Sequence, residues 1–130
     1  MNPAAGRILI VDDEPPLLRM MSLYLGRLGY SATTADSTGK AWSLVEADPG
    51  AFAAAVLDGS MAGMSMEELA RRLLDANPAL RVLAYSGYPV DMTALEAVAP
   101  GRVAFLLKPF TPEMLAEAMR RLLAAQEQNL

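Results

Sequence analysis

Short apolar runs alternate along the chain with longer stretches in which apolar residues recur every three or four positions. The short runs are typical of buried strands, and the longer stretches are typical of helices with one apolar face. The pattern therefore predicts five strands, each followed by a helix. The expected strands cover residues 7–11, 30–35, 52–57, 81–85 and 103–107.

The first and last helical stretches each carry an apolar face that predicts how they pack. One face of a helix that covers a sheet is expected to be apolar, because that face is buried. The residues on these faces are Leu18, Met21, Leu25 and Leu28 in the first stretch, and Leu115, Ala118, Met119 and Leu122 in the last.

Local signals mark several helix ends. Ser65, with Glu68 three residues later, has the form of a capping box. Thr111 before Pro112 supplies an N-cap followed by a proline at the first helical position. Gly29 is expected to end the first helix.

The strict alternation of strands and helices with short connections predicts a parallel sheet with helices on both faces. Ligands of such sheets bind beyond the carboxyl ends of the strands, where the strand order reverses. Polar residues follow the first, third, fourth and fifth expected strands, and we therefore expect the site at this edge. These residues are Asp12 and Asp13, Asp58, Ser86, and Lys108.

Composition narrows the classes of function. A chain of 130 residues with 53% hydrophobic residues has enough material for one core. It has no cysteine and no histidine, which excludes thiolate and imidazole chemistry as well as a phosphohistidine of its own. The net charge of -4 without a long basic run argues against nucleic-acid binding. The apolar runs are too short for membrane insertion and the N-terminus lacks a signal-peptide core, so we expect a soluble, cytoplasmic protein.

Four short motifs stand at the expected strand ends: VDDE after the first, LDGSM after the third, YSGY after the fourth and FLLKPF after the fifth. Together they resemble the response-regulator receiver domain of two-component signalling. The resemblance covers nearly the whole chain, and we expect one domain over residues 1–130 with a core of about 7–125. It implies a flavodoxin-like (βα)5 fold with strand order 2-1-3-4-5, an order that periodicity alone does not give.

Three carboxylates that meet at one sheet edge raise one another's pKa unless a cation lies among them, and Mg2+ prefers such oxygen ligands. The resemblance implies that Asp58 is the phosphoacceptor. It further implies that Asp13, Asp58 and the backbone carbonyl of Ser60 bind Mg2+, or Mn2+ in its place, and that Asp12 acts mostly through water.

The resemblance also assigns roles on the far side of the phosphoryl group. Lys108 would neutralise its charge, and the Ser86 hydroxyl would hydrogen-bond one of its oxygens. The peptide bond between Lys108 and Pro109 is expected to be cis. Ser86 and Phe105 would form a switch that changes the face of the fourth helix, fifth strand and fifth helix, although a static, buried Phe105 stays an alternative. A homodimer through this face stays open.

The phosphoryl donor must be another molecule, because the chain has no histidine. A histidine kinase, a histidine phosphotransfer domain or a small-molecule donor fits this requirement. The first helix carries a second apolar stripe, and we expect this stripe to dock the donor protein together with two residues after the fifth strand. The alternative is packing of the stripe against the fifth helix or loops. The docking residues are Leu17, Met20, Tyr24, Pro109 and Phe110.

The chain departs from the family pattern at two positions, and other classes of function remain to be compared with a receiver. Ala62 and Met66 stand where the family usually has proline and glycine, which puts the loop and the entry to the third helix in doubt. A haloacid-dehalogenase-type phosphatase also uses an aspartate nucleophile, but it needs a second aspartate where this chain has Ser60. A pseudo-receiver that only binds proteins is a further alternative. We expect no enzyme beyond self-directed phosphoryl transfer and autodephosphorylation.

Overall fold

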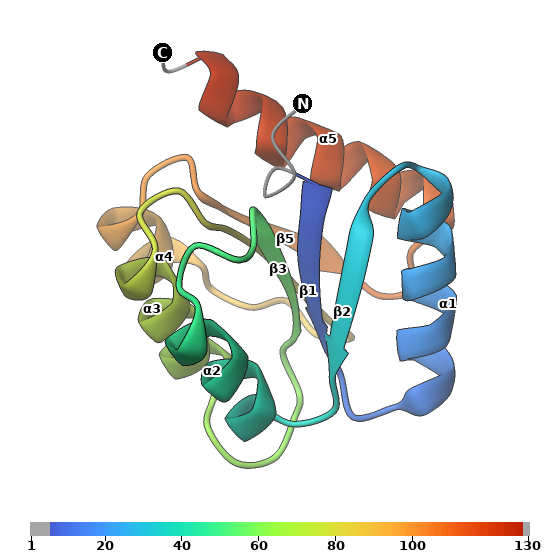
Figure 1. The fold of residues 1–130 in the computed structure, drawn as a ribbon, viewed down its shortest axis with the longest axis horizontal. Coiled ribbons are helices and arrows are strands. Elements are labelled where there is room, and N and C mark those ends of the chain that lie inside the picture. The colour runs from blue at the N-terminus through green and yellow to red at the C-terminus, as the bar shows by residue number, and fades with distance from the viewer. Residues whose placement is uncertain (1–5, 129–130) are drawn as a thin grey trace.

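The computed structural model describes residues 6–128, with side chains described up to Ala124. Five strands and five helices alternate along it, as predicted (Figure 1). The elements are β1 (Arg7–Val11), α1 (Pro15–Arg27), β2 (Ser31–Ala35), α2 (Thr38–Ala47), β3 (Ala54–Asp58), α3 (Met66–Ala76), β4 (Arg81–Ser86), α4 (Thr93–Val98), β5 (Val103–Leu107) and α5 (Pro112–Gln128). No helix in this described range is long and apolar enough to cross a membrane.

The strands form one parallel sheet in the order β2-β1-β3-β4-β5, which confirms the flavodoxin-like arrangement. The third strand begins two residues later than predicted. Phe52 lies before it, buried, with the Arg7 guanidinium 5.5 Å from the centre of its ring. The strand instead extends to Asp58, which pairs with Tyr85 of β4. The strand end that carries chemistry is therefore part of the sheet.

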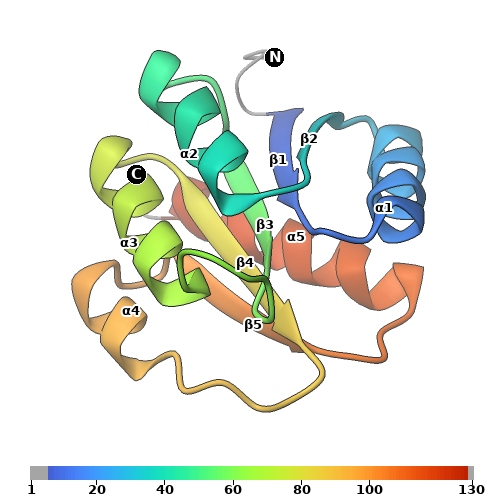
Figure 2. The same cartoon turned by 90° about the horizontal axis from the view of Figure 1, so that it is seen from below.

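Helices cover both faces of the sheet (Figure 2). On one face, α1 and α5 pack on alternate residues of the central strands, such as Ile8, Ile10 and Val56. On the other face, α2, α3 and α4 pack on the intervening residues, such as Leu9 and Leu57. Each central strand is therefore buried on both sides, as expected for a parallel sheet.

The apolar face of α1 ends earlier than predicted. Leu18, Met21 and Leu25 are buried, but Leu28 is 45% exposed. The helix ends at Arg27, and Gly29 adopts φ of 98°, a conformation that only glycine takes readily. The chain turns away from the helix axis at this point, so Leu28 leaves the buried face.

Side chains form hydrogen bonds with backbone groups at both ends of α3. The Ser65 hydroxyl accepts a hydrogen bond from the Glu68 backbone N–H, which confirms the N-cap half of the predicted capping box, whereas the Glu68 carboxylate pairs with Arg72. Met66 therefore opens a regular helix, and its half-buried side chain packs on the core. At the other end, the Arg102 guanidinium donates to the carbonyls of Leu74 and Asn77.

Candidate functional site

The register of the sheet places three polar side chains in one row at its carboxyl edge. Val11 pairs with Leu57, so Asp12 lies beside Asp58, and Asp58 pairs with Tyr85. Asp12 and Asp58 continue the alternation of the residues that face α1 and α5, and Tyr85 belongs to that same apolar cluster. Side chains on one face of neighbouring strands are close enough to interact. The row therefore joins β1, β3 and β4 in a single site.

Asp12, Asp13 and Asp58 form the acidic cluster. Each offers a carboxylate oxygen, and these oxygens all lie within 4.8 Å of one another. Asp12 and Asp58 are buried, whereas Asp13 is exposed. Burial raises the pKa of the Asp12 carboxyl above its usual value, and the nearby Asp58 adds to this rise. The set contains only oxygen donors, which suits a hard divalent cation.

The Asp58 carboxylate is held at one of its two oxygens. Its Oδ1 accepts a hydrogen bond from the Ser60 backbone N–H at 3.1 Å and another from the Ser60 hydroxyl at 2.9 Å. Among the residues with described side chains, no hydrogen bond engages Oδ2. The carboxylate is thus oriented while one oxygen stays available to react. The hydrogen bond from the Ser60 hydroxyl to Asp58 was not predicted from the sequence.

Gly59 connects this carboxylate to the end of β4. Its backbone N–H donates to the Tyr85 carbonyl at 2.7 Å. A Cβ at this position would lie 3.2 Å from both the Tyr85 carbonyl oxygen and the Ser86 Cβ. Glycine therefore permits the close approach of the loop to the strand. Ser86 is buried, and its hydroxyl oxygen accepts a hydrogen bond from the backbone N–H of Tyr88.

Lys108 follows β5 at the same edge. Its backbone N–H donates to the Ser86 carbonyl, and the peptide bond to Pro109 is cis, as the resemblance implied. Its ammonium lies 5.1 Å from the centre of the Tyr85 ring. Among the described residues, no salt bridge within 4.0 Å joins Lys108 to the three acids.

Tyr85 is the site residue that the sequence analysis missed. It is fully buried, and its hydroxyl donates a hydrogen bond to Oδ2 of Asp12. Burial and the bond to Asp12 raise the pKa of the Tyr85 hydroxyl, so it stays protonated and remains a donor. A signal was present in the sequence: a tyrosine inside a buried strand needs a partner for its hydroxyl, and acids end two other strands of the same sheet.

The remaining predicted residues lie around two surface grooves. Four of the five docking residues line one groove together with Lys108: Leu17, Met20, Pro109 and Phe110. Tyr24 is not among its lining residues and packs against the cluster under α1 and α5, as Leu17 and Phe110 also do. Phe105 is half-buried and lines a second groove between β5 and α5.

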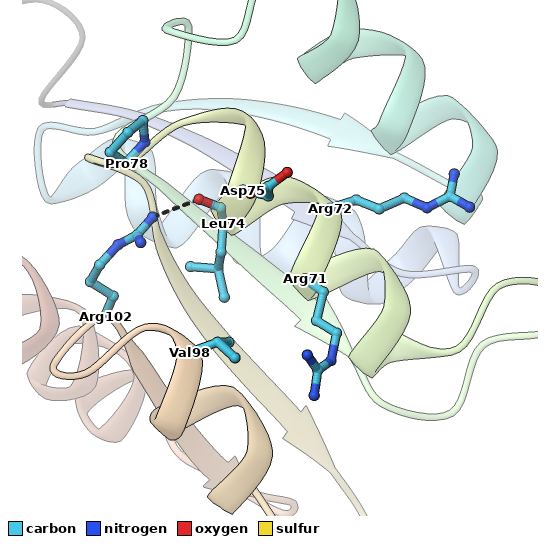
Figure 3. A pocket seen from close by; sticks show the side chains of 7 residues that line it. All are labelled: Arg71, Arg72, Leu74, Asp75, Pro78, Val98 and Arg102. Atoms are coloured by element: carbon cyan, nitrogen blue, oxygen red, sulfur yellow. Dashed lines mark hydrogen bonds between the residues drawn. The ribbon is translucent and has the colours of Figure 1, made fainter.

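A third groove, between α3 and α4, is lined by three arginines, each of which has a partner within the protein (Figure 3). Arg71 and Arg72 pair with glutamates one turn earlier, at 3.5 and 2.8 Å. Arg102 is engaged by the backbone carbonyls at the end of α3, one of which Figure 3 shows. These arginines are therefore already paired, and the groove lies toward the amino ends of β4 and β5, away from the acidic cluster.

Comparisons with known proteins agree with this architecture. The chain is 32% identical over 123 residues to the alginate biosynthesis transcriptional regulatory protein AlgB of Pseudomonas putida; the match covers 94% of this chain and 27% of that protein. The chain therefore spans about a quarter of that relative's length.

Solved structures show the same fold. A response regulator receiver domain protein (CheY-like) from Methanospirillum hungatei superimposes with a TM-score of 0.84 at 26% identity, covering 96% of this chain and 98% of the other. A response regulator from Burkholderia pseudomallei, with a phosphorylated aspartic acid, a calcium ion and citrate, gives 0.75 at 26% identity, covering 95% and 72%. The family model described as the response regulator receiver domain matches residues 8–120. Together with the strand order and the acidic edge, this match shows that the chain belongs to the response regulator receiver domain family.

Proposed function

We propose that the chain accepts a phosphoryl group on Asp58 as the receiver of a two-component system or phosphorelay in the cytoplasm. One observation carries the proposal: the buried Asp58 carboxylate is oriented through Oδ1 by Ser60 and lies among two further acids at the carboxyl edge of the sheet. A related structure contains a phosphorylated aspartic acid, which supports the same chemistry here.

The transfer is a displacement at phosphorus. The free oxygen of Asp58 forms the new P–O bond while the bond from phosphorus to the donor breaks. With a partner phosphohistidine, the leaving imidazole nitrogen keeps the bonding electrons and takes a proton from water. With a small acyl phosphate, the carboxylate leaves as an anion. No group of this chain besides Asp58 needs to change its bonds.

Magnesium fits the acidic cluster because every donor in it is an oxygen and the three carboxylates lie within 4.8 Å. We propose that Asp13, Asp58 and the Ser60 carbonyl hold it, with Mn2+ as a substitute. When bound, the ion neutralises the carboxylates and the phosphoryl oxygens that approach them. Lys108 would supply the remaining positive charge, and the Ser86 side chain, which lies against Gly59, would donate a hydrogen bond from its hydroxyl to a phosphoryl oxygen.

The groove beside Lys108 supports docking of a histidine kinase or a histidine phosphotransfer domain. Its lining is mainly apolar and it opens next to the lysine that would meet the phosphoryl group. Met20 contributes a side chain that is 40% exposed on α1. A helix of the donor protein that fills this groove would bring its phosphohistidine to the acidic edge.

The output of the phosphorylated state would involve the β5 edge of the sheet, which α4 and α5 flank. We propose that Ser86 and Phe105 couple the site to the face made by α4, β5 and α5, where Phe105 lines a groove. A second copy of the chain is one candidate occupant of this face. Since the relative AlgB is a much longer transcriptional regulator, the output of a whole protein stays outside this proposal.

Magnesium should stabilise the protein by relieving the repulsion in the acidic cluster. At 100 times its dissociation constant, a ligand of the folded state raises the free energy of unfolding by about 2.7 kcal/mol. Asp13→Asn should melt at a higher temperature than the wild type in EDTA and lose most of the response to Mg2+. Thermal unfolding followed by circular dichroism checks both results. Asp75→Asn, an exposed acid outside the cluster, serves as the control, and equal Mg2+ responses of the two variants would contradict the assignment.

Phosphorylation is tested by intact mass after incubation with acetyl phosphate and Mg2+. The wild type should gain one phosphoryl group, whereas Asp58→Asn and the wild type in EDTA should gain none. Lys108→Ala should be phosphorylated at least about tenfold more slowly, because it lacks the charge that stabilises the transition state. An adduct on Asp58→Asn would place the acceptor elsewhere and would refute the proposal.

Docking is tested with a histidine phosphotransfer domain that phosphorylates the wild type. Met20→Lys should slow transfer from this donor by about tenfold, equivalent to roughly 1.4 kcal/mol, because a charge in the groove must be desolvated on binding. Its phosphorylation by acetyl phosphate should be unaffected. Leu23→Lys changes a residue of the same helix that is 63% exposed and lies outside the groove, and it should transfer normally. Equal slowing of both variants would rule out this groove.

A further inference from the structure

Tyr85 reaches from β4 to an acid two strands away. Asp58 of β3 stands between Tyr85 and Asp12 in the row, so the backbones of β4 and β1 are separated by about 10 Å, twice the spacing of neighbouring strands. A tyrosine is long enough to cross this gap, whereas a serine or threonine is not. Its hydroxyl donates to Oδ2 of Asp12, and both side chains are fully buried.

The bond from Tyr85 completes the hydrogen bonding of the Asp12 carboxylate. Oδ1 of Asp12 accepts the backbone N–H of Glu14 at 2.8 Å, so each oxygen has a donor. A carboxylate fixed at both oxygens has one orientation. Its position beside the cluster is thereby fixed, while direct coordination of a cation falls to the carboxylates of Asp13 and Asp58.

The ring of Tyr85 is itself fixed on two sides. The Phe110 ring packs against it in a T-shaped arrangement, with ring centres 5.7 Å apart and planes inclined by 70°. The Lys108 ammonium lies 5.1 Å from the ring centre, within the range of a cation–π contact. One side chain therefore contacts the acid after β1 and the lysine after β5, which come from opposite sides of the site.

We propose that Tyr85 is a positioning residue of the acidic site. Its hydroxyl fixes the orientation of Asp12 so that the cluster binds a divalent cation, and its ring holds the Lys108 ammonium near that cluster through a cation–π contact. This inference rests on the proposed function for its purpose, but the cation can be measured without any phosphoryl donor. Partners that orient the groups around a metal typically change metal affinity by 10–100-fold when they are removed.

Tyr85→Phe tests the hydroxyl alone, since it keeps the ring. Isothermal titration with MgCl2 should give a dissociation constant about tenfold higher than that of the wild type. Tyr30→Phe removes a hydroxyl from another tyrosine packed on the same apolar cluster and should leave the Mg2+ affinity unchanged. Far-ultraviolet circular dichroism establishes that each variant is folded at the temperature of the titration.

A double-mutant cycle separates positioning from a general effect on packing. If Tyr85 acts through Asp12, Tyr85→Phe should change the Mg2+ affinity less than twofold in an Asp12→Asn background. The same loss in both backgrounds would overturn the proposal, as would a wild-type affinity in Tyr85→Phe. A wild type that binds Mg2+ but takes no phosphoryl group from acetyl phosphate would refute the proposed function alone. A wild type that binds no Mg2+ would refute both.

Discussion

Repulsion between carboxylates at the carboxyl edge of the sheet is the constraint on which the rest of the site depends. The register of β1 and β3 puts Asp12 beside Asp58, and Asp13 completes a cluster with oxygens within 4.8 Å. Two of these acids are buried, where an ionised carboxylate is costly without donors or a cation. The surrounding hydrogen bonds from Ser60, Glu14 and Tyr85 offset part of this cost, and they also give the carboxylates fixed orientations.

The scaffold holds this unfavourable arrangement because the strands beneath it are buried on both faces. Residues of β1, β3 and β4 alternate between the cluster under α1 and α5 and the cluster under α2, α3 and α4. A shift of register by one residue would turn each of these strands over and exchange the residues that pack under the two layers of helices, so that neither cluster would keep its packing. The hydrophobic core therefore fixes which polar side chains meet at the edge. We expect the acids to destabilise the metal-free protein locally, and the proposed cation would relieve their repulsion.

Much of this arrangement could be predicted from the sequence, since strand ends in an alternating α/β chain bring their polar residues to one edge. Asp12, Asp13 and Asp58 were found in this way, and the structure brings them together. The strand order needed the family resemblance, because periodicity does not say which strands pair. Tyr85 was missed because its contact crosses β3 and depends on the register of three strands, which the order alone does not give. Leu28 was misplaced because the helical period continues in the sequence beyond the residue at which the chain turns.

We propose that the acidic edge binds a divalent cation and a phosphoryl-like group together at Asp58. Fluorine-19 nuclear magnetic resonance with beryllium fluoride, which mimics a phosphoryl group on a carboxylate, tests this binding without catalysis or turnover. We expect resonances of protein-bound fluoride that require Mg2+ and vanish in Asp58→Asn. Bound resonances that persist in that variant, or no bound resonances from the wild type at saturating Mg2+, would contradict it.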